Sequence, residues 1–192
     1  MDAYTLKIIR HELNNSLARM LFLIDEVKDK VLKIKLEKEV NLINEFLNES
    51  NGSNIPSTEI DILSLVKEIL GSNSGIELFS DFSDFSVLGN KTIIRHILEN
   101  LVANALKYSD GQIKIMLRKE GETICFEISN NGDKLGSEEE GNLFDYGFRG
   151  SNSKYALGEG VGLYYANKLA TSAGYDLSYE FTNQHVFRVI FN

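Results

Sequence analysis

Apolar residues recur every three or four positions over residues 3–50, a pattern that predicts two helices joined by a turn. The first helix has a coiled-coil-like seam at Leu6, Leu13, Leu17, Met20, Ile24, Val27 and Val31. The second helix keeps this spacing and has a wider stripe, made of Leu32, Leu36, Val40, Leu42, Ile43, Phe46 and Leu47. Because two helices cannot enclose such a stripe, we expect a second copy of the chain to complete a four-helix bundle. The alternative is that the hairpin packs on the rest of its own chain.

A linker over residues 48–58, which holds the only proline, Pro56, separates this hairpin from a different pattern. Helical spacing returns at residues 60–70, 93–108 and 161–171. Strand-like runs occur at residues 76–79, 85–88, 113–117, 124–128, 177–181 and 187–191. We therefore predict an α+β chain of two domains, a hairpin over 1–52 and an α/β sandwich over 59–192. In the sandwich, helices should cover one face of a mostly antiparallel sheet.

Composition narrows the classes of partner. The 192 residues carry a formal net charge of −8, which argues against nonspecific nucleic-acid binding and against attachment to anionic lipid. No apolar run approaches the roughly 20 residues that span a bilayer, so we expect a cytoplasmic chain. The single cysteine, Cys125, lies in a strand-like run and is expected to be a buried core thiol in a reducing compartment.

Two asparagines occupy the helix over residues 93–108. Asn100 and Asn104 are four residues apart and therefore share one face of an otherwise apolar helix. Burying an amide without partners is costly, so the pair indicates a polar guest. Alternatively, both amides cap a turn or face water.

A glycine-rich segment, residues 157–163, opens the helix over 161–171. Alternating glycines let the backbone approach a ligand, and a helix N-terminus favours phosphate. The segment does not follow a strand and lacks the Gly-Lys-Ser/Thr ending of a P-loop, so by itself it is a weak signal.

Three further segments change this assessment. Asn130-Asn131-Gly132-Asp133 ends a strand, residues 143–150 read LFDYGFRG, and a polar stretch follows over 151–155. In order with the asparagine helix and the glycine-rich segment, they resemble the N box, first glycine box, phenylalanine box, lid and second glycine box of the GHKL ATPase superfamily. The histidine-kinase branch is the most similar. The resemblance covers nearly everything from about residue 59 onward and implies a Bergerat-type ATP-binding domain that uses ATP and Mg²⁺.

The resemblance also implies a role for each matching residue. Asn104 matches the magnesium ligand, and Asn100 matches a residue beside it that contacts phosphate or the metal's surroundings. The other matching positions are Lys107, Tyr108 and Arg149 for the phosphates, Asn130 for the base, Gly132 in the first glycine box, and Gly158, Gly160 and Gly162 for the loop at the end of the lid.

Two positions of the first glycine box depart from the family's pattern. Asn130 stands where the family has an aspartate that accepts a hydrogen bond from the adenine amino group, and Lys134 replaces a glycine. An amide oxygen can accept the same bond without charge assistance. Its NH₂ group could also donate to a guanine carbonyl, which gives the hypothesis that Asn130 relaxes adenine selectivity.

His11 lies outside the seam on the first helix and is expected to face solvent. A lone exposed histidine is usually without function, yet residues 11–17 resemble the H box of sensor histidine kinases. The resemblance implies that His11 is the phosphoacceptor and that Glu12 hydrogen-bonds its ring. Asn15 matches the position that orients water for hydrolysis of a partner's phosphoaspartate.

The leading interpretation is therefore the core of a two-component sensor protein-histidine kinase. It would phosphorylate His11 from ATP and pass the phosphoryl group to an aspartate of a response-regulator receiver domain, with phosphatase activity through Asn15. The homodimer would form through the hairpin, and any membrane link would lie in a sensor region outside this chain. The alternatives are a histidine phosphotransferase with a degenerate ATP site and a non-catalytic, ATP-gated interaction module.

Overall fold

The computed structural model describes residues 15–17, 19–20, 23–30, 32–33, 36, 40, 57–71, 75–151 and 160–191. The chain divides into two compact units, Met1–Ile55 and Pro56–Asn192. Each unit is described by itself below.

In the first unit the described residues form two helical stretches with a turn between them. Residues 15–17, 19–20 and 23–25 are helical, residues 26–29 make the turn, and residues 30, 32–33, 36 and 40 are helical again. Leu17, Ile24 and Val40 form a buried cluster, and Leu36 packs against it. All four belong to the apolar seams that the sequence shows. Met20, another seam residue, is 50% exposed in the single chain.

A five-stranded sheet forms one layer of the second unit. Its strands are β2 (Ile76–Ser80), β4 (Ile113–Glu120), β5 (Thr123–Asn130), β6 (Asp176–Phe181) and β7 (His185–Phe191), in the order β2-β4-β5-β7-β6. β2 runs parallel to β4, and every other neighbouring pair is antiparallel. The sheet is thus mixed and mostly antiparallel, as predicted.

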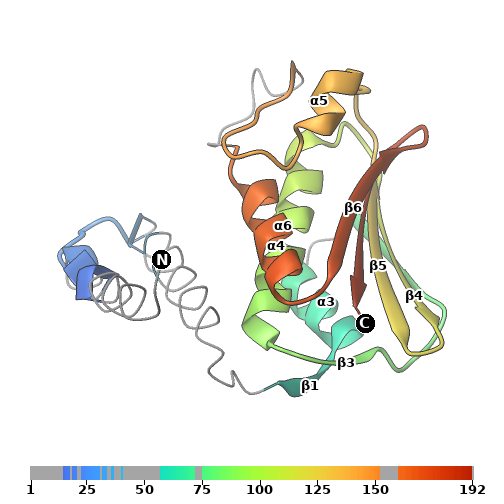
Figure 1. Ribbon diagram of the computed structural model, residues 1–192, viewed down its shortest axis with the longest axis horizontal. Coiled ribbons are helices and arrows are strands. Elements are labelled where there is room, and N and C mark those ends of the chain that lie inside the picture. Colours follow the sequence, from blue (N-terminus) through green and yellow to red (C-terminus); the bar gives the residue numbers. More distant parts are fainter. Residues whose placement is uncertain are drawn as a thin grey trace, which may run out of the picture. The chain divides into compact units, whose positions relative to one another are not determined.

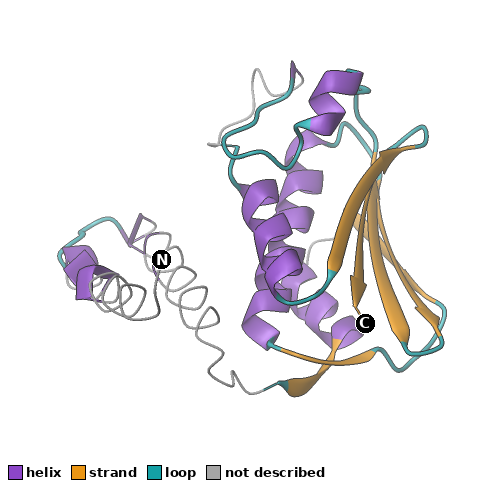
Figure 2. Cartoon of the chain, viewed as in Figure 1, coloured by secondary structure: helices purple, strands orange, loops and turns teal. Residues whose placement is uncertain are grey.

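Three helices cover one face of this sheet (Figure 1). They are α3 (Ile62–Leu70), α4 (Lys91–Tyr108) and α6 (Gly162–Ser172). Figure 2 shows the resulting two layers, with the helices on one side and the strands on the other. The predicted α+β architecture is therefore confirmed for this unit.

Successive side chains of a strand point to opposite faces of the sheet, so every second side chain points towards the helices. Ile124, Phe126 and Ile128 of β5 are fully buried, and Phe187, Val189 and Phe191 of β7 are nearly so. α4 contributes the apolar positions that the sequence predicts as its buried face, namely Ile93, Ile94, Ile97, Leu98, Leu101, Val102 and Ala105. The core of the unit lies between α4 and the central strands.

Two features were not predicted. Residues Thr58–Asp61 form β1, which pairs antiparallel with β3 (Ser86–Gly89) in a separate two-stranded sheet. The sequence assigns these residues to a linker and to the start of a helix, because TEID contains one buried apolar residue, Ile60, which also fits the helical spacing that follows. The short helix α5 (Ser137–Gly141) was also missed, because its sequence, SEEEG, has no apolar periodicity.

The prediction for Cys125 was wrong. Its neighbours Ile124 and Phe126 point into the core, so Cys125 points to the opposite face of the sheet and is only half-buried. Partial burial raises the pKa of its thiol, which makes the thiolate scarce at neutral pH. On the same face Arg188 donates to Glu127 (2.7 Å) and Glu180 (2.6 Å). Within the described part of the chain, no helix is long and apolar enough to cross a membrane.

The start of α4 is fixed by a side-chain cap. The Oδ1 atom of Asn90 accepts hydrogen bonds from the backbone N–H groups of Thr92 (2.8 Å) and Ile93 (3.2 Å). Asn90 has extended backbone angles, as an N-cap residue should.

We predict that Asn90→Ala lowers the free energy of unfolding by about 1 kcal/mol, because two N–H groups at the helix start lose their acceptor. Urea denaturation of the full chain, followed by tyrosine fluorescence, measures the change. Asn90→Ser keeps a capping oxygen and should recover most of the loss. Equal stability of the alanine and wild-type chains would contradict the assignment.

Candidate functional site

A cavity of about 230 Å³ opens in the second unit between α4, the sheet and the loops beside them. Its walls come from segments far apart in the sequence. They are Asn100, Ala103, Asn104, Lys107 and Tyr108 of α4, Asn130 of β5, Leu135, Leu143, Phe148, Arg149 and Gly150 of the following loop region, Gly160, Val161, Gly162 and Leu163 around the start of α6, and Tyr179, His185 and Phe187 of β6 and β7.

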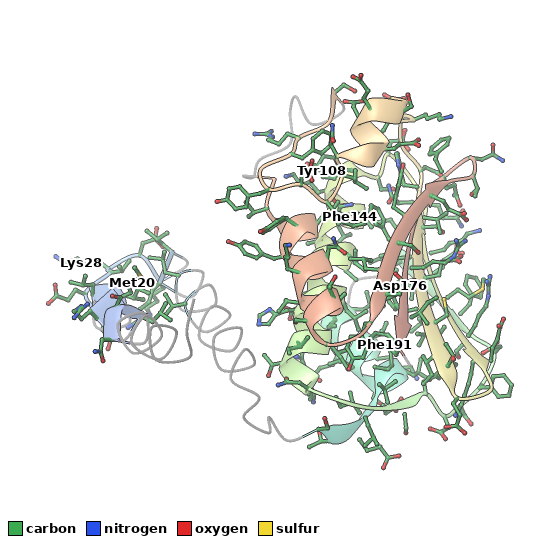
Figure 3. All side chains as sticks on the ribbon, viewed as in Figure 1. Met20, Lys28, Tyr108, Phe144, Asp176 and Phe191 are labelled. Carbon is green, nitrogen blue, oxygen red and sulfur yellow. The ribbon has the colours of Figure 1, made fainter. Side chains whose placement is uncertain are left out.

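α4 supplies polar groups along one face. Asn100 and Asn104 line the cavity one helical turn apart, and Lys107 and Tyr108 follow at the end of the helix. Figure 3 places Tyr108 at the C-terminal end of α4. The Asn100 Nδ2 atom donates to the backbone oxygen of His96 (2.9 Å), which fixes the orientation of the amide. The Lys107 Nζ atom lies 5.0 Å from the centroid of the Tyr108 ring.

The start of α6 is held against this face by two glycines. Gly160 has a φ of +75°, and a Cβ atom there would collide with the backbone oxygen of Phe148. A Cβ atom at Gly162 would lie 3.0 Å from the Asn100 Oδ1 atom. Close packing thus brings the N-terminus of α6 to the cavity, and its unpaired N–H groups favour an anionic ligand.

Glu139 of α5 holds the loop that carries Arg149 and Gly150. Its carboxylate accepts hydrogen bonds from the backbone N–H groups of Gly136 (2.8 Å) and Ser151 (2.6 Å) and from the Ser151 hydroxyl (3.2 Å). The two backbone hydrogen bonds lower the pKa of the Glu139 carboxyl. The carboxylate is therefore ionised at neutral pH and anchors this loop beside the cavity.

The sheet contributes a polar floor. Asn130 and His185 are opposite each other in the β5–β7 ladder and are the buried polar residues of the described chain, 2% and 5% exposed. The Nδ1 atom of His185 lies 2.9 Å from the Tyr179 hydroxyl, and its Nε2 atom lies 3.0 Å from the backbone oxygen of Asp133. Burial raises the pKa of Tyr179 to about 12, with a smaller contribution from Glu140.

Eight of the residues predicted for the nucleotide site line this one cavity: Asn100, Asn104, Lys107, Tyr108, Asn130, Arg149, Gly160 and Gly162. Gly132 lies next to it, since a Cβ atom there would be 3.1 Å from the Tyr108 backbone oxygen and 3.2 Å from the His185 ring. His11, Glu12 and Gly158 lie outside the described residues. Asn15 is half-buried in the first unit.

Sequence reasoning missed Tyr179 and His185. The signal was available, because His185 has the same parity as the buried Phe187, Val189 and Phe191 of β7. A strand extended two residues towards the N-terminus would have placed an imidazole on the core face. What the sequence could not provide is the strand order that sets His185 opposite Asn130.

The arrangement has three chemical zones. Leu135, Leu143 and Phe187 form apolar walls around the polar floor, which suits a flat heteroaromatic ring. The start of α6, Lys107 and Arg149 offer N–H donors and positive charge, which suit a polyphosphate. Mg²⁺ takes oxygen ligands and keeps waters and phosphate oxygens, so one amide oxygen from Asn104 is an adequate protein ligand. The residues present therefore fit a magnesium nucleotide.

Residues 89–191 match the profile of the histidine kinase-, DNA gyrase B-, and HSP90-like ATPase family. Because this match covers more than half of the chain, the protein belongs to that ATPase family.

Individual proteins similar to this chain include a sensor histidine kinase and a heme sensor protein. The chain is similar to the sensor histidine kinase HprS of Escherichia coli strain K12, with 28% identity over 156 residues, 75% of this chain and 34% of HprS. It is similar to the heme sensor protein HssS of Staphylococcus aureus strain Newman, with 25% identity over 186 residues, 85% of this chain and 40% of HssS. The chain thus spans between a third and two fifths of these relatives.

Two solved structures share the fold. The catalytic domain of the histidine kinase ThkA, in a nucleotide-free form, has a TM-score of 0.62 at 23% identity and covers 71% of this chain and 95% of its own. The Acinetobacter baumannii histidine kinase AdeS has a TM-score of 0.58 at 17% identity and covers 98% of this chain and 95% of its own. At these identities the likeness concerns the fold alone.

We predict that Gly160→Ala lowers the free energy of unfolding by at least about 1 kcal/mol, because a side chain is disfavoured at positive φ and would press on the Phe148 carbonyl. Thermal unfolding of the full chain measures it. Gly141→Ala is the matched control, since no atom would lie within 4 Å of a Cβ there. Equal losses in the two variants would contradict a packing role for Gly160.

Proposed function

We propose that this chain is the catalytic core of a two-component sensor protein-histidine kinase. The observation that carries the proposal is the convergence of eight residues, predicted for ATP and Mg²⁺ from four separate segments, on one cavity. The similarity to HprS supports the histidine-kinase branch of the ATPase family. The chain would act in the cytoplasm, as part of a longer sensor or by itself.

In this function the cavity binds ATP with Mg²⁺. Asn104 gives an amide oxygen to the metal, and Asn100 supports it from one turn earlier on α4. The metal, when bound, neutralises charge on the phosphates. Lys107, Tyr108 and Arg149 hold the phosphates, and the glycine-rich segment with Gly158, Gly160 and Gly162 brings the N–H groups of α6 to them.

His11 is proposed as the acceptor of the γ-phosphoryl group. A neutral imidazole nitrogen attacks the γ-phosphorus in line, the new N–P bond forms, and the bond to the bridging oxygen of ADP breaks. Glu12 hydrogen-bonds the other ring nitrogen and takes its proton. An aspartate of a receiver domain then takes the phosphoryl group. Asn15 would orient water for the reverse function, hydrolysis of the phosphoaspartate.

The partners follow from the same proposal. The exposed seam residue Met20 and its neighbour Leu23, 50% and 62% exposed, support a homodimer through the hairpin. Residues that follow His11 in the chain, among them Arg19 of the first helix and Glu26 of the turn after it, are candidates for contact with the receiver domain, and both are exposed.

A second candidate is a histidine phosphotransferase that no longer binds ATP. It is favoured only by Asn130 and Lys134, which depart from the family's pattern. A third is an ATP-gated interaction module in which His11 is incidental. A single labelling experiment with ATP distinguishes these three candidate functions.

We expect the full chain, incubated with γ-labelled ATP and Mg²⁺, to acquire acid-labile, alkali-stable label that His11→Gln abolishes. His96→Gln, which changes a histidine of α4 outside the cavity lining, is the control and should keep the label. ATP binding without label would support the interaction module. Absence of ATP binding would support the phosphotransferase.

We also predict that Asn104→Ala weakens binding of ATP in the presence of Mg²⁺ by at least about tenfold, or about 1.4 kcal/mol. The reason is the loss of the metal's protein ligand. Isothermal titration with and without Mg²⁺ measures the effect. Asn167→Ala, on α6 and outside the cavity lining, should bind as the wild type does. An equal loss without Mg²⁺ would contradict the metal-ligand role.

A further inference from the structure

We infer that Glu139 is a positioning residue for the phosphate end of the nucleotide site, because it holds Arg149 where the terminal phosphate of a triphosphate lies. The motifs that indicate the nucleotide site do not include Glu139. The inference rests on the proposed function and adds a physical cause for recognition of the γ-phosphate, which is a loop closed by one carboxylate.

The side chain of Glu139 joins the two ends of one segment. Its Oε2 atom accepts hydrogen bonds from the backbone N–H group of Gly136 (2.8 Å) and from the Ser151 hydroxyl (3.2 Å). Its Oε1 atom accepts one from the backbone N–H group of Ser151 (2.6 Å). Gly136 directly precedes α5, so the carboxylate closes residues 136–151 into a loop. The last residues of this loop, among them Arg149 and Gly150, line the cavity.

Both oxygens of Glu139 are needed for this closure. Glutamine has the same shape but only one acceptor oxygen, so in either orientation its NH₂ group would face the N–H group of Gly136 or that of Ser151. The backbone hydrogen bonds from Gly136 and Ser151 lower the pKa of the Glu139 carboxyl, which keeps both oxygens as acceptors at neutral pH. The substitution Glu139→Gln therefore breaks the closure without removing side-chain volume.

Contacts with α6 and the residues before it hold the same loop from a second side. A Cβ atom at Gly160 would lie 3.0 Å from the Arg149 Cγ atom, so the stem of this arginine packs on the glycine. The ring of Tyr146 packs edge to face on that of Tyr164 in α6, with 5.3 Å between the ring centroids. Arg149 is thus held between the closure at Glu139 and the start of α6, which lowers the entropy cost of ordering it around a phosphate.

The position of Arg149 along the cavity determines which phosphate it meets. The first glycine box, which holds the base in the proposed function, lies against the end of α4, since a Cβ atom at Gly132 would be 3.1 Å from the Tyr108 backbone oxygen. The start of α6 lies about two turns earlier on α4, since a Cβ atom at Gly162 would be 3.0 Å from the Asn100 Oδ1 atom. Arg149 lies with the start of α6. It therefore meets the phosphate farthest from the base, which ATP has and ADP lacks.

The test compares the affinities of the full chain for ATP and for ADP, each with Mg²⁺, by isothermal titration. Glu139→Gln should weaken ATP binding by about three- to tenfold and leave ADP binding close to that of the wild type. The ratio of the ATP affinity to the ADP affinity should therefore fall. General damage to the fold would lower both affinities together and would not move this ratio.

Glu138→Gln is the matched control, because it removes the same charge from the exposed neighbouring position of α5. Its ratio should equal that of the wild type. A double variant then tests whether Glu139 acts through Arg149. Arg149→Ala lowers the ratio by itself, and adding Glu139→Gln to it should lower the ratio no further, because residues that act through one contact are not additive.

A second variant covers the case in which Glu139→Gln does not fold. Ser151→Ala removes one of the three donors to the Glu139 carboxylate at an exposed position outside the core. It should lower the ratio of the ATP affinity to the ADP affinity about twofold. An unchanged ratio in this variant would then overturn the inference.

The outcomes separate this inference from the proposed function on which it rests. An unchanged ratio in Glu139→Gln, whether both affinities stay or fall together, would overturn the positioning role of Glu139. A full additional fall of the ratio in the double variant would show that Glu139 does not act through Arg149 and would overturn it as well. Binding of neither nucleotide by the wild type would overturn the proposed nucleotide site itself.

Discussion

The structure depends on the packing of α4 against the sheet. Seven apolar side chains of this helix are buried, so its rotation about its own axis is fixed by the core. The same fixed rotation also sets the direction of the helix's polar face. Asn100 and Asn104 must point away from the core. A helix that could turn by even one position would place its amides in the core or its isoleucines in the cavity. The core thereby positions the polar residues of the site.

A second constraint comes from the hydrogen-bond commitments of the polar groups around the cavity. Asn130, Asn100, His185 and Glu139 each use part of their bonding capacity within the protein. The Nδ2 groups of Asn130 and Asn100 already donate within the protein, so their Oδ1 atoms remain as acceptors, and Glu139 holds the neighbouring loop beside the cavity. Because a buried polar group without a partner is costly, these commitments determine which ligand edges are acceptable.

Much of the fold could be predicted because its elements are long and strongly periodic. The buried face of α4 agrees residue by residue with its sequence pattern, and buried positions alternate regularly along β5 and in the first five residues of β4. Two short elements escaped prediction because they carry almost no apolar residues: β1 has one buried residue, Ile60, and α5 has none. The prediction for Cys125 was wrong because it followed the apolar neighbours Ile124 and Phe126, whereas adjacent residues of a strand point to opposite faces of the sheet.

The sequence by itself indicated the ATPase family and eight of the residues that line the cavity, because spaced motifs are local patterns. Only the tertiary structure placed Tyr179 and His185 beside Asn130 in the lining of the cavity. Asn130 and His185 are 55 positions apart, and only the β5–β7 pairing sets them opposite each other. The direction of the Asn130 amide and the tautomer of His185 depend on backbone oxygens of the loop after β5. No local pattern encodes these, since they arise from distances between segments that meet only in the folded chain.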